Sequence, residues 1–340
     1  MKAVLVGAGR TGGRIALALA QKGWQLKVVD RDCVEEGDLK DSPAFARADV
    51  GKMKAGVLAE KVRHRTGSPA EGGSGNVRHY NASLAAGEGS GNVRHYKTEI
   101  AFACEHLCGQ NTDELLGGAQ VVIDATDNWR ARALINEWCW RNGVPWAYCG
   151  ALGTKAMASA IVPPEKPCWL CWNAVEPKEV LSCSAYGIEA AAAQKAAEKA
   201  VEQAEAIAAG GRPALLGKLF FADVGKGIEA ETKLAGRGDC PVCAKNQFRL
   251  LWAREETELV CGGGQWLFLN AGLAEKVRHY NNAEVARKLG GDARIIGEVV
   301  AMEKDGAKAI VFPGGRVTVR AKHEPDAAKL NYEIVGRLAK

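Results

Sequence analysis

The sequence predicts an α/β fold built on a doubly wound, mostly parallel sheet. An apolar run at residues 2–6 ends in a glycine-rich turn, and helical periodicity follows at residues 15–20. A second apolar run stops at Asp30, so strand, turn, helix, strand and acid follow in the order of a Rossmann-type βαβ unit. After residue 243 the pattern changes to short strands, turns and a helix near residues 283–289, which predicts a small C-terminal α+β domain.

The remaining elements are expected in the alternation that a parallel sheet needs. Short apolar runs bounded by polar or glycine-rich loops indicate strands, and apolar residues three and four apart indicate helices. The expected elements are a strand at 26–29, a helix at 51–63, a strand at 120–124, a helix at 128–142, a strand at 145–149 and an alanine-rich helix at 189–209.

Composition and charge exclude several classes of protein. Of the 340 residues, 47% are hydrophobic and 25% are charged, which argues against disorder and against a fibrous repeat. The net charge of +5 is spread along the chain, so it does not indicate a nucleic-acid-binding protein. No apolar run reaches the roughly 18 residues of a membrane span, and the first strand begins at residue 2. We therefore expect no membrane segment, no signal peptide and a cytoplasmic location.

The glycine-rich turn indicates a nucleotide site. Gly7-x-Gly9-x-x-Gly12 opens a helix, and Asp30 lies 18 residues after Gly12. Glycines let a phosphate approach the backbone, the helix N-terminus offers free N–H groups, and the acid accepts hydrogen bonds from ribose hydroxyls. The pattern alone does not choose NAD over ATP, and a tight turn without a ligand is the structural alternative.

Two Cys-x-x-Cys pairs predict a structural zinc knuckle. Four thiolates complete a closed tetrahedral shell, which leaves no open position for catalysis. Two separate redox dithiols are the alternative, but Pro167 before the first pair and Pro241 inside the second favour knuckle turns. The expected ligands are Cys168, Cys171, Cys240 and Cys243.

An internal duplication interrupts the sheet pattern. Residues 73–80 recur as residues 89–96, and the core of the repeat returns at residues 277–280. Two adjacent copies are too few for a solenoid, so we expect a flexible, Gly/Ser-rich surface insertion at residues 67–96. A basic and aromatic loop that contacts nucleic acid is the alternative.

Five motifs in a fixed order support a family resemblance. They are the glycine loop, Asp30-Arg31-Asp32, Gly51-Lys52-Met53-Lys54, Asp124-Ala125-Thr126-Asp127-Asn128 and the paired Cys-x-x-Cys units. In this order they closely resemble the MoeB/ThiF/HesA family, the prokaryotic relatives of ubiquitin-activating enzymes. The resemblance covers about residues 3–245. It therefore implies a ThiF-type adenylation domain at residues 1–245 and a small C-terminal α+β domain at residues 246–340.

The resemblance implies ATP-dependent adenylation of a carboxylate, usually the C-terminal glycine of a ubiquitin-like or sulfur-carrier protein ending in Gly-Gly. ATP, Mg²⁺ and Zn²⁺ are implied as cofactors, and a homodimer is implied as the assembly. Lys54 matches the family lysine on the triphosphate, and Asp127 matches the acid associated with magnesium. Arg132 and Asn136 match the family helix. The implied nucleotide-binding residues are Gly7, Gly9, Gly12, Asp30, Asp32, Lys54, Asp127 and Asn128.

Cys183 is the candidate acyl acceptor, because relatives carry a cysteine in a similar loop before a helix. A cysteine near a helix N-terminus has a lowered thiol pKa and is the better nucleophile. A packed, inert thiol is the alternative. Core positions are expected for Cys33, Cys104, Cys108, Cys139 and Cys149.

Three features depart from the family pattern. Asp41 occupies the position of a family arginine, and Arg10-Thr11 occupies the place where a glycine usually follows the second loop glycine. The family's N-terminal helix, which supplies a second arginine, is not seen before the first strand. We expect Arg10 or Lys40 to replace part of the missing positive charge. The structural alternatives are a solvated helix lysine for Lys54 and a helix N-cap role for Asp127.

Together with the motifs, the family resemblance implies a homodimeric, zinc-stabilised adenylyltransferase with Asp127, Lys54, Cys183 and Arg10 as catalytic candidates. Two alternatives stay open. One is a ThiF-like adenylase that acts on a peptide or a tRNA. The other is a catalytically degenerate family member that binds a carrier or a nucleotide without turnover. An NAD-dependent dehydrogenase fits the glycine loop but leaves Lys54, Asp127 and the cysteine pairs without a role.

Overall fold

The computed structural model describes residues 1–40, 42–66, 99–176, 187–253, 257–261, 265–268, 270, 273, 276–277 and 279–340. The predicted insertion at 67–96, the candidate acyl acceptor Cys183 and the departure at Asp41 all lie outside these residues.

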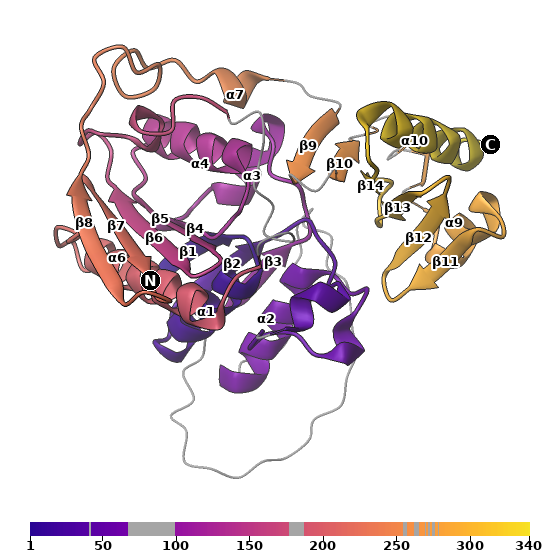
Figure 1. Cartoon of the computed structure of the whole chain (residues 1–340), viewed down its shortest axis with the longest axis horizontal. Helices are drawn as coiled ribbons and strands as arrows, with labels where there is room; N and C mark the ends of the chain where they lie inside the picture. Colours follow the sequence, from indigo (N-terminus) through magenta and orange to yellow (C-terminus); the bar gives the residue numbers. More distant parts are fainter. Residues whose placement is uncertain are drawn as a thin grey trace, which may run out of the picture.

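The main sheet has eight strands in the order β3-β2-β1-β4-β5-β6-β7-β8 (Figure 1). The pairs from β3 to β5 are parallel, as predicted, and the pairs from β5 to β8 are antiparallel. The strands are β1 Lys2–Val6, β2 Gln25–Val29, β3 Ile100–Ala103, β4 Val121–Asp124, β5 Trp146–Leu152, β6 Lys155–Ile161, β7 Lys218–Asp223 and β8 Ile228–Lys233.

Helices cover both faces of this sheet, so the fold is doubly wound (Figure 1). Along β1, Ala3 and Leu5 pack against α1, α2 and α6, whereas Val4 and Val6 pack on the side of α3 and α4. The helices are α1 Arg10–Gln21, α2 Lys54–Thr66, α3 Thr112–Leu116, α4 Trp129–Asn142, α6 Ala190–Ala208 and α7 Arg249–Trp252, with short 3-10 turns η1 Glu36–Leu39, η2 Arg47–Asp49, η3 Gly109–Asn111 and η4 Trp169–Cys171.

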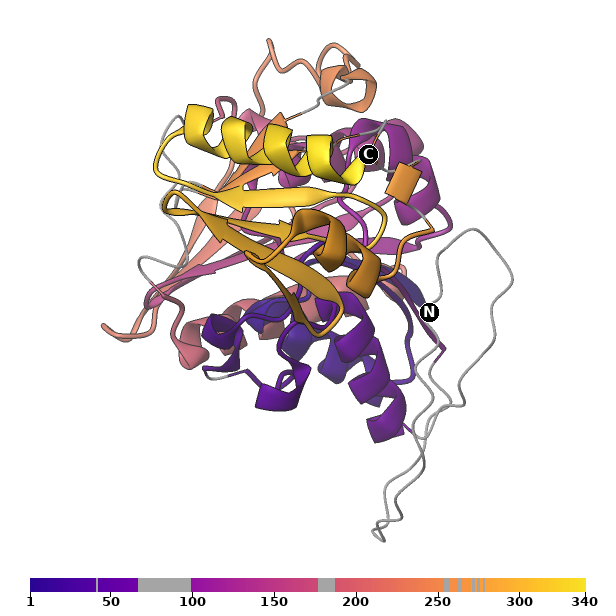
Figure 2. The ribbon, with the colours of Figure 1, turned by 90° about the vertical axis from the view of Figure 1, so that its right-hand side faces the viewer.

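The C-terminal residues form an α+β unit, as predicted, with its own apolar core. Its sheet is antiparallel, in the order β11-β12-β13-β14-β10-β9, and α9 and α10 lie on one face of it (Figure 2). The elements are β9 Thr257–Cys261, β10 Gln265–Phe268, α9 Asn282–Leu289, β11 Ala293–Ile296, β12 Val299–Lys304, β13 Ala307–Val311, β14 Val317–Arg320 and α10 Glu324–Leu338.

The C-terminal sheet packs on the segments that flank the predicted nucleotide site. Val299 and Phe312 form a small buried cluster with Cys33 and Met53. Gly51 has φ +85°, and a Cβ there would lie 2.3 Å from the carbonyl oxygen of Ile296. Only glycine permits this approach, because any side chain would meet the neighbouring backbone in a conformation that L residues rarely adopt.

Candidate active site

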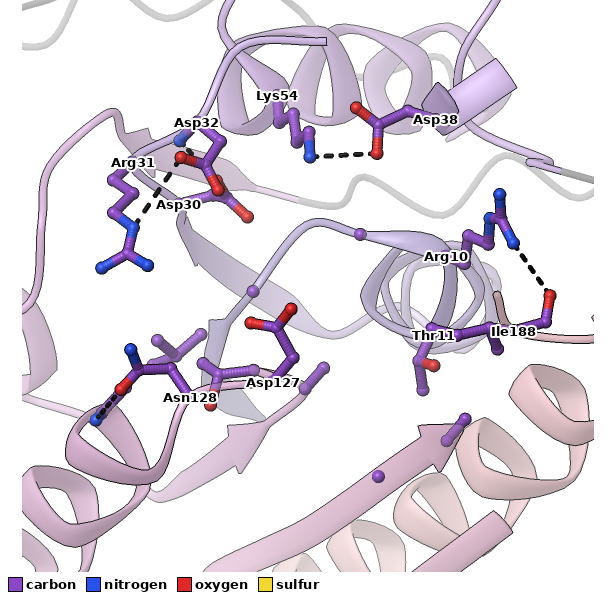
Figure 3. A pocket seen from close by; sticks show the side chains of 18 of the residues that line it. Arg10, Thr11, Asp30, Arg31, Asp32, Asp38, Lys54, Asp127, Asn128 and Ile188 are labelled. Carbon is purple, nitrogen blue, oxygen red and sulfur yellow. Dashed lines mark hydrogen bonds and ion pairs between the residues drawn. The ribbon is translucent and has the colours of Figure 1, made fainter. Parts of the chain in front are cut away.

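The candidate site is a cavity of about 770 Å³ at the carboxyl ends of the parallel strands. It lies where the chain leaves β1 and β4, which are neighbours although they are distant in sequence. Ligands bind at such a topological switch point in doubly wound sheets, and the volume suits a nucleotide. The wall includes most of the predicted nucleotide-binding residues, namely Gly7, Gly9, Asp30, Asp32, Lys54, Asp127 and Asn128 (Figure 3).

The three loop glycines serve different purposes. Gly7 has φ +98°, and a Cβ there would lie 2.6 Å from the carbonyl oxygen of Ala125. A Cβ on Gly12 would lie 1.9 Å from the carbonyl oxygen of Gly7, so Gly12 closes the loop and is not part of the cavity wall. Gly9 has open space where its Cβ would be. The backbone at Gly9 is therefore the surface that an anion can approach.

The N-terminus of α1 faces this open space. Gly9 is the N-cap, and the first intrahelical bond runs from the N–H of Gly13 to the carbonyl of Gly9. The N–H groups of the first turn have no intrahelical acceptor, and the positive end of the helix dipole lies there. Arg10 and Thr11 of this turn line the cavity. This arrangement is suited to a phosphate.

Asp30 and Asp32 form an acidic pair at the end of β2. One oxygen of Asp30 accepts from the N–H of Ala8 at 2.6 Å, and the other accepts from the N–H of Asp32 at 2.7 Å. The first of these bonds joins the acid to the glycine loop. Burial and the neighbouring Asp32 carboxylate raise the pKa of Asp30 from 3.8 to about 6, although Lys54 acts in the opposite direction.

The raised pKa of Asp30 gives a testable pH dependence. The folded state binds this proton more tightly than the unfolded chain, so its stabilising effect is present below pH 3.8 and lost as pH rises through about 6. Between pH 4.5 and pH 7, the free energy of unfolding of wild type should therefore fall by about 2 kcal/mol relative to that of Asp30→Asn. Urea unfolding at the two pH values measures it. A difference that does not change with pH would contradict the assignment.

Lys54 stands at the start of α2 and points toward the acidic residues. Its Nζ lies 3.0 Å from Oδ1 of Asp38, and only 14% of its side chain is exposed. The alternative of a solvated helix lysine is therefore wrong. Burial alone would lower the pKa of Lys54, but the carboxylates of Asp38, Asp32 and Asp30 outweigh it and hold the pKa above its ordinary value. The site contains a buried, permanently charged ammonium group.

Arg10 joins three segments around the cavity. Its guanidinium donates to the carbonyl of Ile188 at 2.8 Å and to the carbonyl of Gly37 at 2.9 Å. Figure 3 shows the side chain reaching from α1 toward Ile188. Carbonyl acceptors fix the geometry but carry no charge, so the positive charge of Arg10 is not neutralised by them. Lys40, the other expected replacement cation, also lines the cavity.

Asp127 and Asn128 lie between β4 and α4. The N-cap of α4 is Asn128, whose side-chain oxygen accepts from the N–H of Ala131 at 2.9 Å. The alternative that Asp127 caps this helix is therefore wrong, and the cap is one residue later. Asp127 is exposed and lines the cavity, and in Figure 3 it faces Lys54 across the pocket. Its carboxylate is thus available to a ligand.

The two helix residues implied by the family are separated in space. Arg132 lies on the cavity wall, where its Nε is 3.3 Å from Oδ2 of the buried Asp124. Its guanidinium also donates to the carbonyl of Thr126. Asn136 is fully buried away from the cavity and accepts from the N–H of Trp169 at 2.9 Å. Asn136 therefore ties α4 to the first cysteine knuckle.

Asp38, Gln265 and Arg320 are among the residues of this site that sequence reasoning missed. Asp38 is the ion-pair partner of Lys54, and no sequence motif indicates this role. Gln265 and Arg320 line the cavity from the C-terminal sheet. The position of Asp38, in the loop that follows Asp30 and Asp32, is the one signal in the sequence that could have indicated it. No local pattern indicates the other two, because their place in the wall depends on long-range packing.

The predicted cysteine ligands come together. The four Sγ atoms of Cys168, Cys171, Cys240 and Cys243 lie within 4.8 Å of one another, and all four residues are buried. The Sγ atoms of Cys168 and Cys240 are 3.5 Å apart, and those of Cys171 and Cys243 are 3.3 Å apart. Tetrahedral zinc with Zn–S bonds of about 2.3 Å places sulfur atoms roughly 3.8 Å apart. The cluster is compatible with zinc.

The surroundings of the cluster also suit a thiolate site. The N–H of Arg237 donates to Sγ of Cys171 at 3.5 Å, which is the kind of contact that stabilises a charged sulfur. The Trp169 and Trp172 rings pack beside the knuckle, with centroids 6.0 Å apart. The other cysteines match the core prediction only in part. Cys33, Cys139 and Cys149 are buried, whereas Cys104 and Cys108 are half-buried.

Among the residues that the structure describes, no helix has both the length and the apolar character needed to cross a membrane.

The similar proteins of known name are adenylyltransferases or activating enzymes. Sulfur carrier protein ThiS adenylyltransferase from Bacillus subtilis is 23% identical over 336 residues, which is 97% of this chain and 91% of that protein. SAMP-activating enzyme E1 from Haloferax volcanii is 27% identical over 72% of this chain and 80% of its own length. Adenylyltransferase and sulfurtransferase MOCS3 from Caenorhabditis briggsae is 25% identical, and the match spans 81% of this chain and 60% of the relative.

Solved structures show the same fold at low sequence identity. MccB of E. coli, in a complex with AMPCPP and MccA, superposes with a TM-score of 0.55 over 72% of this chain and 66% of that chain, at 17% identity. The sequence model of the ThiF family matches residues 1–242, which is well over half of the chain. The matched residues contain the glycine loop, Lys54, Asp127 and the first three zinc-ligand candidates. The chain belongs to the ThiF family.

Proposed function

We propose that this chain is an ATP-dependent adenylyltransferase that activates the C-terminal glycine carboxylate of a ubiquitin-like or sulfur-carrier protein. One observation carries the proposal: the N-terminus of α1, the charged Lys54 and the exposed Asp127 all border one cavity at the switch point of the sheet. Its relatives from Bacillus subtilis and Haloferax volcanii bear names that describe the activation of carrier proteins of this kind.

The residues of the cavity fit the nucleotide. The open backbone at Gly9 and the helix N-terminus would receive phosphates, and Asp30 and Asp32 would receive the ribose hydroxyls. Lys54 would stabilise negative charge on the triphosphate. Asp127 offers a carboxylate of the type that binds Mg²⁺, and that ion would supply further charge neutralisation at the phosphates.

The proposed reaction is a displacement at the α-phosphorus. A carboxylate oxygen of the carrier forms the new P–O bond, the bond to the β-phosphate oxygen breaks, and pyrophosphate leaves with the electron pair. Negative charge builds on the phosphate oxygens in the transition state, so fixed positive groups such as Lys54 stabilise it more than the ground state. The carboxylate is a weak nucleophile, and positioning supplies the remaining acceleration.

Transfer to a cysteine after adenylation is proposed only for Cys183, which lies outside the described residues. Cys149 lines the cavity, but its S–H donates to the carbonyl of Asp124 at 3.1 Å. Burial, with the Asp124 carboxylate, raises the pKa of Cys149, so its thiol stays protonated and is a poor acceptor.

The four-cysteine cluster is proposed to hold one structural zinc ion, because four buried sulfurs leave no position for a substrate. The homodimer and the division into residues 1–245 and 246–340 stay predictions of the family resemblance.

The test is ATP–pyrophosphate exchange with a panel of small carriers that end in Gly-Gly. Each carrier is matched by a version that lacks the final glycine, and short peptides and tRNA are assayed in parallel. Exchange that needs the intact Gly-Gly end supports the proposal. Exchange with a peptide or with tRNA alone would replace the carrier with that substrate, and ATP binding without exchange on any substrate would favour the degenerate family member.

A further inference from the structure

The C-terminal sheet contributes two side chains to the nucleotide cavity. Gln265 of β10 and Arg320 of β14 face each other in the antiparallel register, so their side chains project from the same face of the sheet. Both line the cavity. Neither residue belongs to the part of the chain that the family model matches, because that match ends at residue 242.

Partly buried contacts fix the position of this sheet against the site. The carboxylate of Glu298 accepts from the N–H of Met53 at 3.0 Å, immediately before Lys54. The guanidinium of Arg316 donates to the carbonyl of Arg31, immediately before Asp32, and to the carbonyl of Cys104. The contacts therefore join the C-terminal sheet to the segment that carries Asp32 and to the segment that carries Lys54. Arg316 directly precedes β14, and Arg320 is the last residue of that strand. The contacts of Arg316 therefore also hold the backbone of Arg320 in place.

The loop at residues 35–38 contacts three cations of the cavity wall. Asp38 pairs with Lys54 at 3.0 Å, and the carbonyl of Gly37 accepts from Arg10 at 2.9 Å. Glu35 pairs with Arg320, at 3.7 Å. The three cations come from α2, α1 and the C-terminal sheet, and this loop gathers them at one side of the cavity.

Of these three cations, Arg320 has the most exposed and most weakly held ion pair. Its side chain and that of Glu35 are 51% and 42% exposed, and an exposed pair at this distance contributes little to stability. Lys54, in contrast, is buried against Asp38. An arginine held by a weak ion pair can exchange its partner for a phosphate, whose oxygens its planar fork matches.

We propose that Arg320 is a phosphate-binding residue, supplied by the C-terminal sheet of the same chain to the β- and γ-phosphates of ATP. The inference rests on the proposed function for the identity of the nucleotide. It adds a positive charge to a site for which the sequence has Asp41 in place of a family arginine. The C-terminal unit is then a part of the active site.

The test compares nucleotide binding by Arg320→Ala with binding by Lys308→Ala, using titration calorimetry with ATP and with AMP. Lys308 lies opposite Arg320 on the neighbouring strand, is exposed, and does not line the cavity, so it is a matched control. Arg320→Ala should raise the Kd for ATP about tenfold and leave the Kd for AMP within a factor of about two. Lys308→Ala should change neither, and Arg320→Lys should recover part of the loss.

Two results would overturn the inference. An unchanged Kd for ATP in Arg320→Ala would show that Arg320 does not contact the phosphates. An equal rise in the Kd values for ATP and AMP would show that Arg320 only supports the cavity wall. A thermal melt checks that the variant folds. Because no carrier is needed, wild type can bind ATP through Arg320 even if no carrier supports exchange; that outcome would reject the proposed function and keep this inference.

Discussion

Replacing Lys54 with alanine is expected to lower the rate of ATP–pyrophosphate exchange by about 10²–10³-fold, the usual effect of removing one preorganised charge at a transition state. The loss follows from the position of the ammonium group. It is buried, it stays charged because three carboxylates surround it, and it points into the cavity (Figure 3). The measurement is exchange at saturating ATP with an active carrier.

Lys52→Ala is the matched control for this variant. Lys52 lies two residues earlier, pairs with Asp49 at 3.4 Å, and is not part of the cavity wall. Its replacement should leave exchange within about twofold, as expected for a surface substitution. Lys54→Ala also leaves Asp38 without its cation, so a thermal melt must show that the variant is folded. A folded Lys54→Ala protein that exchanges at the wild-type rate would exclude Lys54 from the chemistry.

Replacing Cys243 with serine is expected to cost the protein its zinc and about 3 kcal/mol or more of unfolding free energy. Metal binding to four thiolates is coupled to folding, because the site does not exist in the unfolded chain. The knuckle also supports the site helix, since Asn136 of α4 bonds to the backbone of Trp169. Metal analysis and a urea titration measure the two losses.

Cys108→Ser is the control for the zinc variant, because Cys108 is half-buried and lies outside the cluster. It should keep about one zinc per chain, the content expected of one closed four-cysteine site. Wild-type protein without bound zinc, combined with a Cys243→Ser variant of unchanged stability, would show that the four thiols are only core residues.

The sequence predicts best what depends on neighbouring residues. The glycine loop, Asp30 and the cysteine pairs are local patterns whose geometry allows few structures, and the structure places them at the cavity and in the cluster. The alternative N-cap at Asp127 is one residue too early. Asp127 and Asn128 are both good capping types, and the sequence does not reveal which of them turns toward the helix.

The antiparallel half of the main sheet could not be recognised from its pattern. β6 is rich in alanine, and every residue of β8 is exposed, so neither strand shows the alternation that identifies a half-buried strand. The sequence also does not predict that Gln265 and Arg320 line the cavity. Their place in the cavity depends on how the C-terminal sheet docks. Long-range contacts such as that of Glu298 with Met53 determine this docking.

The most direct test of the adenylation mechanism is ATP–pyrophosphate exchange by wild type and by Asp127→Ala, with a carrier that ends in Gly-Gly and with AMP binding measured in parallel. Asp127 is exposed to the cavity and does not cap α4, so its loss should spare the fold. We expect the variant to bind AMP like wild type and to lose exchange by about 10²-fold or more. Exchange by Asp127→Ala at the wild-type rate would contradict the mechanism.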